Sequence, residues 1–149
     1  MARYAADVRR TASTTASVGS LGAGATARRI SLYLLAFGSE AAPADQALLW
    51  ELSACTALGT STAVTPKQLD IADAAALAAA GENHTVEPTY AGSPYFNIAL
   101  NQKATWLWQS LPELGIVAPA TTGSGWGIRT PTITSGTPVV TAQMHFVEH

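Results

Sequence analysis

Three histidines are the residues of this 149-residue chain best suited to bind a metal or to act as a general base. Only His145, Glu148 and His149 lie close enough in sequence to form a group of metal ligands. In a β-strand, His145 and His149 would point to the same face because side chains alternate along a strand. A metal site at this position is one interpretation. The one we favour is a chain end without a metal, since a metal site needs ligands that converge.

A nucleophilic serine or cysteine requires a positioned base and oxyanion donors. The segment Thr122-Gly-Ser-Gly-Trp126 lacks the Gly-x-Ser-x-Gly elbow, and Gly19–Gly24 lacks both the lysine of a phosphate-binding loop and the glycine spacing of a dinucleotide fold. Asp70 and Asp73 are explained as residues that cap a helix. The only cysteine, Cys55, lies in an apolar run and is most simply a buried side chain. We therefore predict no enzyme, no metal and no cofactor.

The tryptophans are more informative than the histidines. Trp106 and Trp108 are two residues apart, so they share one face of a strand, and Trp126 stands between two glycines. Such a pair is compatible with a sugar-stacking platform. It is also typical of a core or a subunit interface, where tryptophan contributes much of the binding energy. We favour the core or interface, because Leu107 indicates that the opposite face is also buried.

The charges are few and unevenly distributed. Charged residues make up 12% of the chain and hydrophobic residues 48%, although a typical domain has about 25% charged residues. Residues 1–29 hold five arginines and one aspartate, whereas residues 30–149 hold three basic and nine acidic residues. This low charge favours a surface that neighbouring proteins cover. The basic segment favours docking onto an acidic surface or a sister subunit, with a freely solvated terminus as the alternative.

Other partners are not supported by the sequence. The arginines have only Tyr4 as an aromatic neighbour and match no nucleic-acid-binding motif, which argues against nucleic acid. No run approaches the roughly 18 apolar residues of a membrane span. The first residues lack the apolar region of a signal peptide, so secretion is unsupported. The candidate interface residues are Arg3, Arg9, Arg10, Arg28, Arg29, Trp106, Trp108 and Trp126.

The elements predicted to position these residues are mainly strands. Residues 1–29 are predicted to be an extended Ser/Thr/Gly-rich arm, and residues 30–149 a single β-sandwich domain. One short helix is expected over residues 69–81, with Asp70 at its start and Gly81 at its end. Residues 59–65 read as a loop, and 44–54 is compatible with a helix although a strand is favoured. Strands are expected at 30–37, 48–55, 85–90, 95–101, 105–110, 115–118, 125–130 and 139–148.

Several of these segments together resemble a family of small structural proteins encoded among the head genes of tailed bacteriophages. The matching stretches include Arg28–Leu35, Ala42–Trp50, Leu69–Leu77, Gly81–Tyr90 and Leu100–Trp106, within residues 28–148. Within that family the sequence is most similar to capsid decoration, or cement, proteins. The resemblance implies a β-sandwich or jelly-roll body, a homotrimer, and a position on the capsid lattice.

These observations lead to a virion structural protein as the expected function. The expected partners are the major capsid protein and further copies of the chain. The expected location is the outer surface of the capsid, after assembly in the host cytoplasm. A tail-tube, connector or fibre subunit is the first alternative, and a carbohydrate-binding module is the second.

Overall fold

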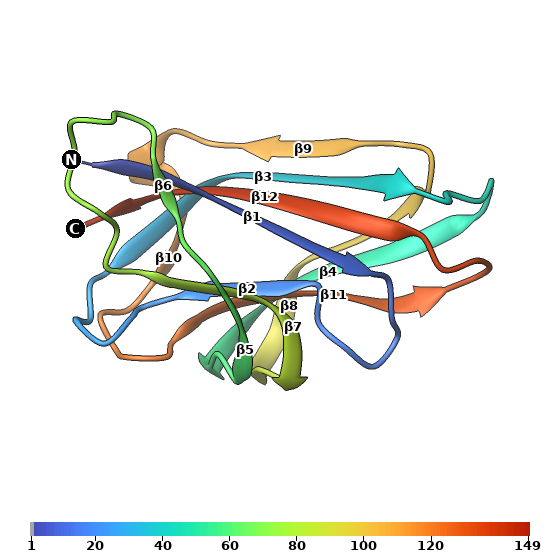
Figure 1. Cartoon of the computed structure of the whole chain (residues 1–149), viewed down its shortest axis with the longest axis horizontal. Helices are drawn as coiled ribbons and strands as arrows, with labels where there is room; N and C mark the ends of the chain where they lie inside the picture. The colour runs from blue at the N-terminus through green and yellow to red at the C-terminus, as the bar shows by residue number, and fades with distance from the viewer. Residues whose placement is uncertain (1) are drawn as a thin grey trace.

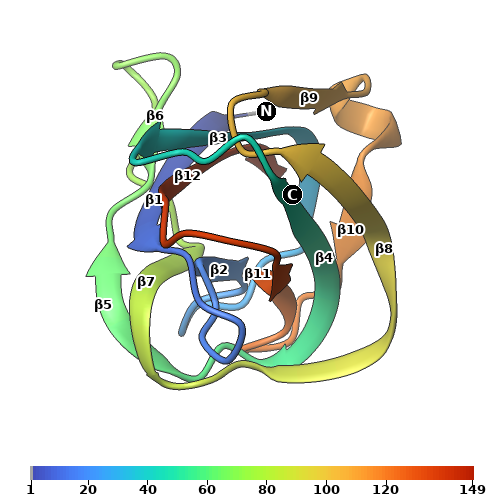
Figure 2. The same ribbon diagram turned by 90° about the vertical axis from the view of Figure 1, so that its right-hand side faces the viewer.

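Two antiparallel sheets of six strands each make up the computed structural model, which describes residues 2–149 (Figures 1 and 2). In sheet A the order is β10-β3-β12-β1-β6, and β9 pairs with the same edge of β3 as β10. In sheet B the order is β5-β7-β2-β11-β4-β8. The strands of sheet A are β1 (Arg3–Thr11), β3 (Ile30–Ala41), β6 (Lys67–Gln68), β9 (Trp106–Gln109), β10 (Ile116–Ala118) and β12 (Val139–Glu148). Those of sheet B are β2 (Gly19–Gly22), β4 (Ala47–Ala57), β5 (Thr60–Val64), β7 (Ala79–Val86), β8 (Thr89–Asn101) and β11 (Gly125–Ile133).

The core lies between the two sheets and follows the two-residue period of the strands. On β12, Val140, Ala142, Met144 and Phe146 are buried and alternate with more exposed residues. The prediction of a mainly β protein with two packed sheets is confirmed. The jelly-roll connectivity implied by the resemblance stays a prediction.

The prediction of an extended arm over residues 1–29 is wrong for the part that the structure describes; Met1 lies outside it. Strand β1 is an inner strand of sheet A, between β12 and β6, and β2 is an inner strand of sheet B. The small residues that suggested an arm allow the two sheets to approach closely. At Gly19, for example, an added Cβ would lie only 2.6 Å from Val8 of sheet A. Leu21, in the same segment, is fully buried.

The helix predicted over residues 69–81 is also wrong. Asp70 caps only a turn, in which its Oδ1 accepts a hydrogen bond from the backbone N–H of Ala72 at 3.0 Å. The chain then enters β7, in which Ala80 is buried. Ala78, which precedes the strand, is buried as well. Tertiary packing has overridden the helix propensity of alanine, which is a weak preference for any single residue. The only helical element in residues 2–149 is the 3₁₀ turn η1 (Pro112–Leu114).

Most of the predicted strands are present, with boundary differences. The strand at 139–148 matches β12, and 48–55 lies within β4, so the helix alternative for 44–54 is wrong. The strand expected at 30–37 is longer, since β3 continues to Ala41, and the expected loop at 59–65 contains β5. No helix within residues 2–149 is long and apolar enough to cross a membrane.

Candidate protein-binding surface

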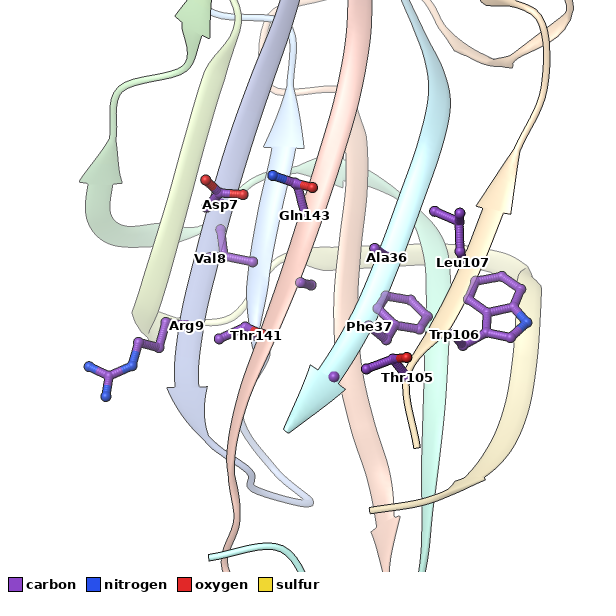
Figure 3. A pocket seen from close by; sticks show the side chains of 12 residues that line it. Asp7, Val8, Arg9, Ala36, Phe37, Thr105, Trp106, Leu107, Thr141 and Gln143 are labelled. Atoms are coloured by element: carbon purple, nitrogen blue, oxygen red, sulfur yellow. The ribbon is translucent and has the colours of Figure 1, made fainter. Parts of the chain in front are cut away.

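A groove of about 620 Å³ runs across the outer face of sheet A (Figure 3). Its floor consists of small side chains on β3 and β12, chiefly Ala36, Gly38 and Thr141. These residues face outward because the intervening Phe37 and Ala142 point into the core. The groove therefore arises where two central strands carry small residues at outward positions, next to Gln143 of β12.

The two walls of the groove differ in chemistry. Asp7 and Arg9 of β1 form one wall, while Thr105, Trp106 and Leu107 form the other (Figure 3). Arg9 is bound by the Glu40 carboxylate, with 2.8 Å between the Arg9 Nη2 and Glu40 Oε1 atoms. This hydrogen bond raises the pKa of Arg9. The groove is thus largely apolar, with its only basic residue already paired.

An aromatic cluster lies beneath the apolar wall. Phe37 stacks on Trp50 with 4.3 Å between ring centroids, and on Trp106 with 5.4 Å. Phe96 of β8 contacts both Trp106 and Trp108 of β9. Because β8 is the edge strand of sheet B and β9 an edge strand of sheet A, these rings close one seam between the two sheets. The apolar wall of the groove is therefore supported by packed aromatic side chains.

Leu107 of the apolar wall is followed along the chain by two further exposed leucines, Leu111 and Leu114. Leu107 is 59% exposed, Leu111 64% and Leu114 72%. They belong to β9 and to the η1 segment that follows it. Apolar surface of this kind beside a groove is typical of a protein-binding site.

The three candidate tryptophans do not form one site. Trp106 lines the groove, yet its ring packs on Phe37 and Phe96, and Trp108 packs on Phe96. Both rings are half-buried at the seam, so they do not form an open sugar-stacking platform. Trp126 is buried in the core. The expectation that Leu107 is buried is wrong, since this residue is on the exposed side of β9.

The five candidate arginines divide into two groups. Arg9 lines the groove, and Arg10 is half-buried and donates a hydrogen bond from Nη1 to the Ser17 carbonyl at 3.1 Å. Arg3, Arg28 and Arg29 are exposed. They lie near the chain ends, since Arg3 pairs with Val147, Arg28 lines a pocket with His149, and the Arg29 carbonyl accepts a hydrogen bond from the His149 backbone N–H. The structure therefore does not place these side chains on a single arm.

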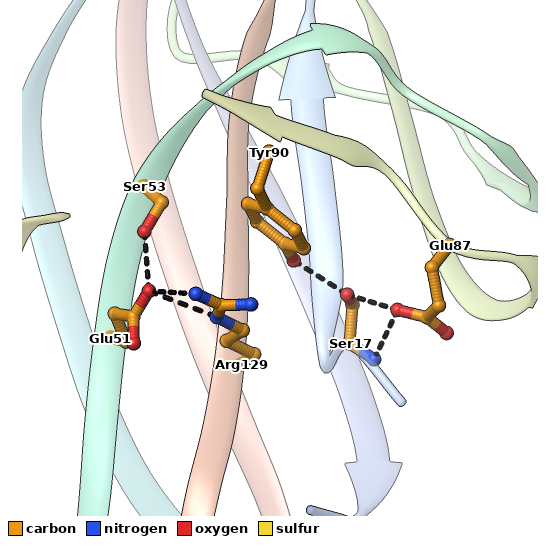
Figure 4. A network of polar contacts seen from close by, with 6 residues as sticks. All are labelled: Ser17, Glu51, Ser53, Glu87, Tyr90 and Arg129. Carbon is orange, nitrogen blue, oxygen red and sulfur yellow. Dashed lines mark hydrogen bonds and ion pairs between the residues drawn. The ribbon is translucent and has the colours of Figure 1, made fainter. Parts of the chain in front are cut away.

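The outer face of sheet B carries a polar network that the sequence analysis missed (Figure 4). The buried Glu51 carboxylate pairs with the Arg129 guanidinium, which lies 4.3 Å from the centroid of the Tyr90 ring. The Tyr90 hydroxyl is 2.5 Å from Ser17 Oγ, and the Ser17 backbone N–H donates to Glu87 at 2.8 Å. Burial raises the pKa of Tyr90 to about 12. This network fastens the loop between β1 and β2 onto sheet B.

The nucleophilic and acid–base side chains of Ser20, His84 and Cys55 are buried. Ser20 Oγ and His84 Nε2 are 3.0 Å apart, and both side chains are buried. Burial lowers the pKa of His84, and its Nδ1 has no hydrogen-bond partner among residues 2–149. Burial also raises the pKa of Cys55 to about 11, which keeps the thiol protonated.

The proposed ligands at the chain end do not converge either. The Glu148 carboxylate accepts hydrogen bonds from the Leu77 and Ala78 backbone N–H groups, and His149 Nε2 is 2.9 Å from Ser31 Oγ. No group of three or more His, Cys, Asp or Glu side chains with metal-site geometry occurs within residues 2–149.

Part of the groove was detectable in the sequence. The alternation of residues 139–148 already separates Thr141 and Gln143 from the buried set, and both line the groove. The pairing of β1 with β12 had no such signal, so Asp7 was missed.

Comparison with protein-family models, curated proteins and solved structures finds no match to this chain.

Proposed function

We propose that this chain is a non-catalytic structural subunit of a virus particle, and specifically a decoration protein that binds the major capsid protein of a tailed-bacteriophage head. The observation that carries the proposal is the groove on sheet A with the exposed leucines beside it. A groove with a floor of alanine, glycine and threonine accepts a partner's backbone or side chains at close range. Of its charged side chains, Arg9 is already paired with Glu40, so Asp7 is the one that a covering protein has to match.

The composition supports a role in an assembly. A specific interface buries about 1,200–2,000 Å² in total, and a low-charge surface reduces the cost of covering such an area. A decoration protein binds a capsid in many copies, so a modest affinity at each site gives a large collective stabilisation. In this proposal the chain is assembled in the host cytoplasm and lies on the outer surface of the capsid.

Binding to expanded, empty heads that lack the chain tests this function. The heads are assembled from the major capsid protein of the phage that this proposal assigns to the chain. We expect the purified chain to co-sediment with the heads, to appear on their outer surface by cryo-electron microscopy, and to raise their melting temperature. The variant Ala36→Lys/Thr141→Lys places two charges on the groove floor and should abolish binding.

The matched control is Ala99→Lys, an exposed position on β8 of sheet B. It should bind heads like the unmodified chain. The proposal is overturned if the unmodified chain stays in the supernatant, or if the groove variant binds as well as the control. Binding to tails alone would favour a tail-tube, connector or fibre subunit.

A further inference from the structure

The loop between β6 and β7 lies at the end of the molecule that holds both termini (Figure 1). This loop exposes Ile71 almost completely, at 96%, together with Leu69 at 43% and Leu77 at 41%. We define the terminal patch by the charged residues and the isoleucine that the argument uses, namely Arg3, Arg28, Arg29, Asp70, Ile71 and Asp73. A nearly fully exposed isoleucine at a loop tip contributes nothing to the core of its own chain.

Hydrogen bonds hold this loop in place. The Leu69 backbone N–H donates to the Arg3 carbonyl at 2.8 Å, and the Tyr4 hydroxyl donates to the Ala74 carbonyl at 3.1 Å. The Glu148 carboxylate accepts from the Leu77 and Ala78 backbone N–H groups at 2.8 and 2.7 Å. The fold therefore presents Ile71 on a loop whose two ends are anchored, which reduces the entropy lost on binding.

A pocket of about 250 Å³ lies beside the loop. Because a water molecule takes about 30 Å³, this volume accommodates an aliphatic side chain. One side of the pocket comes from the loop and the other from the two chain ends and the segment before β3. Its lining includes Ala2, Tyr4, Arg28, Ala74, Leu77 and His149.

The terminal patch carries charges of both signs without compensation. It holds three arginines, Arg3, Arg28 and Arg29, and two aspartates, Asp70 and Asp73. The ion pairs within residues 2–149 are Arg9–Glu40 and Arg129–Glu51, so none of these five side chains takes part in one. The pocket itself combines apolar residues with Arg28, Glu148 and His149. A surface with an apolar knob, a mixed pocket and charges of both signs outside any ion pair is able to complement itself.

We propose that the terminal patch binds a second copy of this chain. Ile71 of one copy enters the pocket of the other, and the acidic loop faces the partner copy's basic segment before β3. Two copies related by a two-fold axis make this contact twice, as a self-complementary surface does. The same contact repeated around a closed ring gives the homotrimer that the resemblance implies. The inference deepens the proposed function, because it supplies the self-association that the function includes.

Sedimentation of the full chain over a range of concentrations tests the contact. We expect a reversible dimer or trimer. The variant Ile71→Asp should weaken association by at least about tenfold, since it replaces the apolar side chain of the contact with a charge. The control Val86→Asp changes another exposed apolar residue, outside the terminal patch, and should associate like the unmodified chain.

Charge reversal gives an independent test of the pairing. Arg28→Glu/Arg29→Glu and Asp70→Lys/Asp73→Lys should each fail to associate alone. Mixed together they should form dimers, because each contact between unlike variants again joins opposite charges. A closed ring of three always contains a contact between like variants, so the mixture should not form trimers. High salt should weaken the mixed complex.

The outcomes separate this inference from the proposed function. A chain that is monomeric at every concentration, or an Ile71→Asp variant that associates normally, overturns the terminal contact. A monomeric Ile71→Asp variant that still binds heads supports both proposals. An oligomeric chain that does not bind heads overturns only the proposed function.

Discussion

The outer faces of the two sheets follow the same two-residue alternation, yet they are used differently. On sheet B, Glu51, Arg129 and Tyr90 satisfy one another, and the loop between β1 and β2 is bound to the same network (Figure 4). On sheet A, the central outward positions hold small residues and the face remains open (Figure 3). A face whose polar groups are paired within the chain has little left to offer a partner. The open face of sheet A is therefore the better surface for binding.

The comparison predicts that the same kind of substitution will affect stability on one face and binding on the other. On sheet B, side chains stabilise the fold through internal contacts. On sheet A, the exposed groove residues Asp7, Leu107 and Gln143 should contribute little to the fold, because their side chains point to solvent. The following changes test this difference, from the largest expected effect to the smallest.

Removing the carboxylate of the sheet B network should have the largest effect. Glu51→Ala leaves the Arg129 guanidinium without its partner and removes the acceptor of the Ser53 hydroxyl. We expect a loss of about 2 kcal/mol in the free energy of unfolding, below the roughly 3–5 kcal/mol for a fully buried pair because Arg129 is partly hydrated. Urea denaturation measures it. Asp7→Ala in the groove is the matched control and should change stability by less than about 0.5 kcal/mol.

Removing only the Tyr90 hydroxyl should have a smaller effect. Tyr90→Phe keeps the ring over Arg129 but removes the hydrogen bond to Ser17. We expect a loss of about 1 kcal/mol in the free energy of unfolding, the usual contribution of one hydrogen bond. Faster proteolysis within residues 12–18 should accompany it, since that loop loses one anchor. Unchanged stability would show that the network does not hold the loop.

Lowering the pH should destabilise the fold through His84, a buried residue of β7 in sheet B. The pKa of His84 is lowered by burial, which outweighs the opposing effect of Glu87 and acts with that of Arg10. Above its unfolded pKa of about 6.5, both states are neutral and stability is complete. As the pH falls below that value, the unfolded chain binds a proton that the folded chain does not, so stability decreases until the lowered pKa is passed.

Urea midpoints between about pH 7.5 and about pH 5 measure this change. The variant His84→Gln should show a smaller decrease than the unmodified chain. The pKa of His145 is lowered in the same direction by burial, so His145→Gln serves as the companion variant. If neither variant alters the pH dependence, the carboxylates control it instead.

The smallest effect on stability is expected at the apolar wall of the groove. Leu107→Ser should change the free energy of unfolding by less than about 0.5 kcal/mol, because this side chain is largely exposed. It should nevertheless weaken binding to heads. A large loss of stability would mean that Leu107 packs within its own chain, and would remove the contrast between the two faces.

The sequence by itself determined the mainly β class and most of the strands, because alternation is a local property. The segment 139–148 shows this best, since every second residue from Val140 to Phe146 is apolar. The same local rules failed where composition is ambiguous. Glycine and alanine at 19–24 and 72–81 are compatible with a linker, a helix or a tightly packed strand.

Only the tertiary structure decided between these alternatives. Residues 19–22 form a strand because Gly19 lies against Val8 of the opposite sheet, and β7 continues sheet B where an isolated alanine-rich segment would favour a helix. The binding surfaces depend on the tertiary structure in the same way. Asp7, Ala36, Leu107 and Thr141 line one groove because β1, β3, β9 and β12 are neighbours in sheet A. Long-range strand pairing has no local signature, so spacing along the chain does not reveal which outward residues meet.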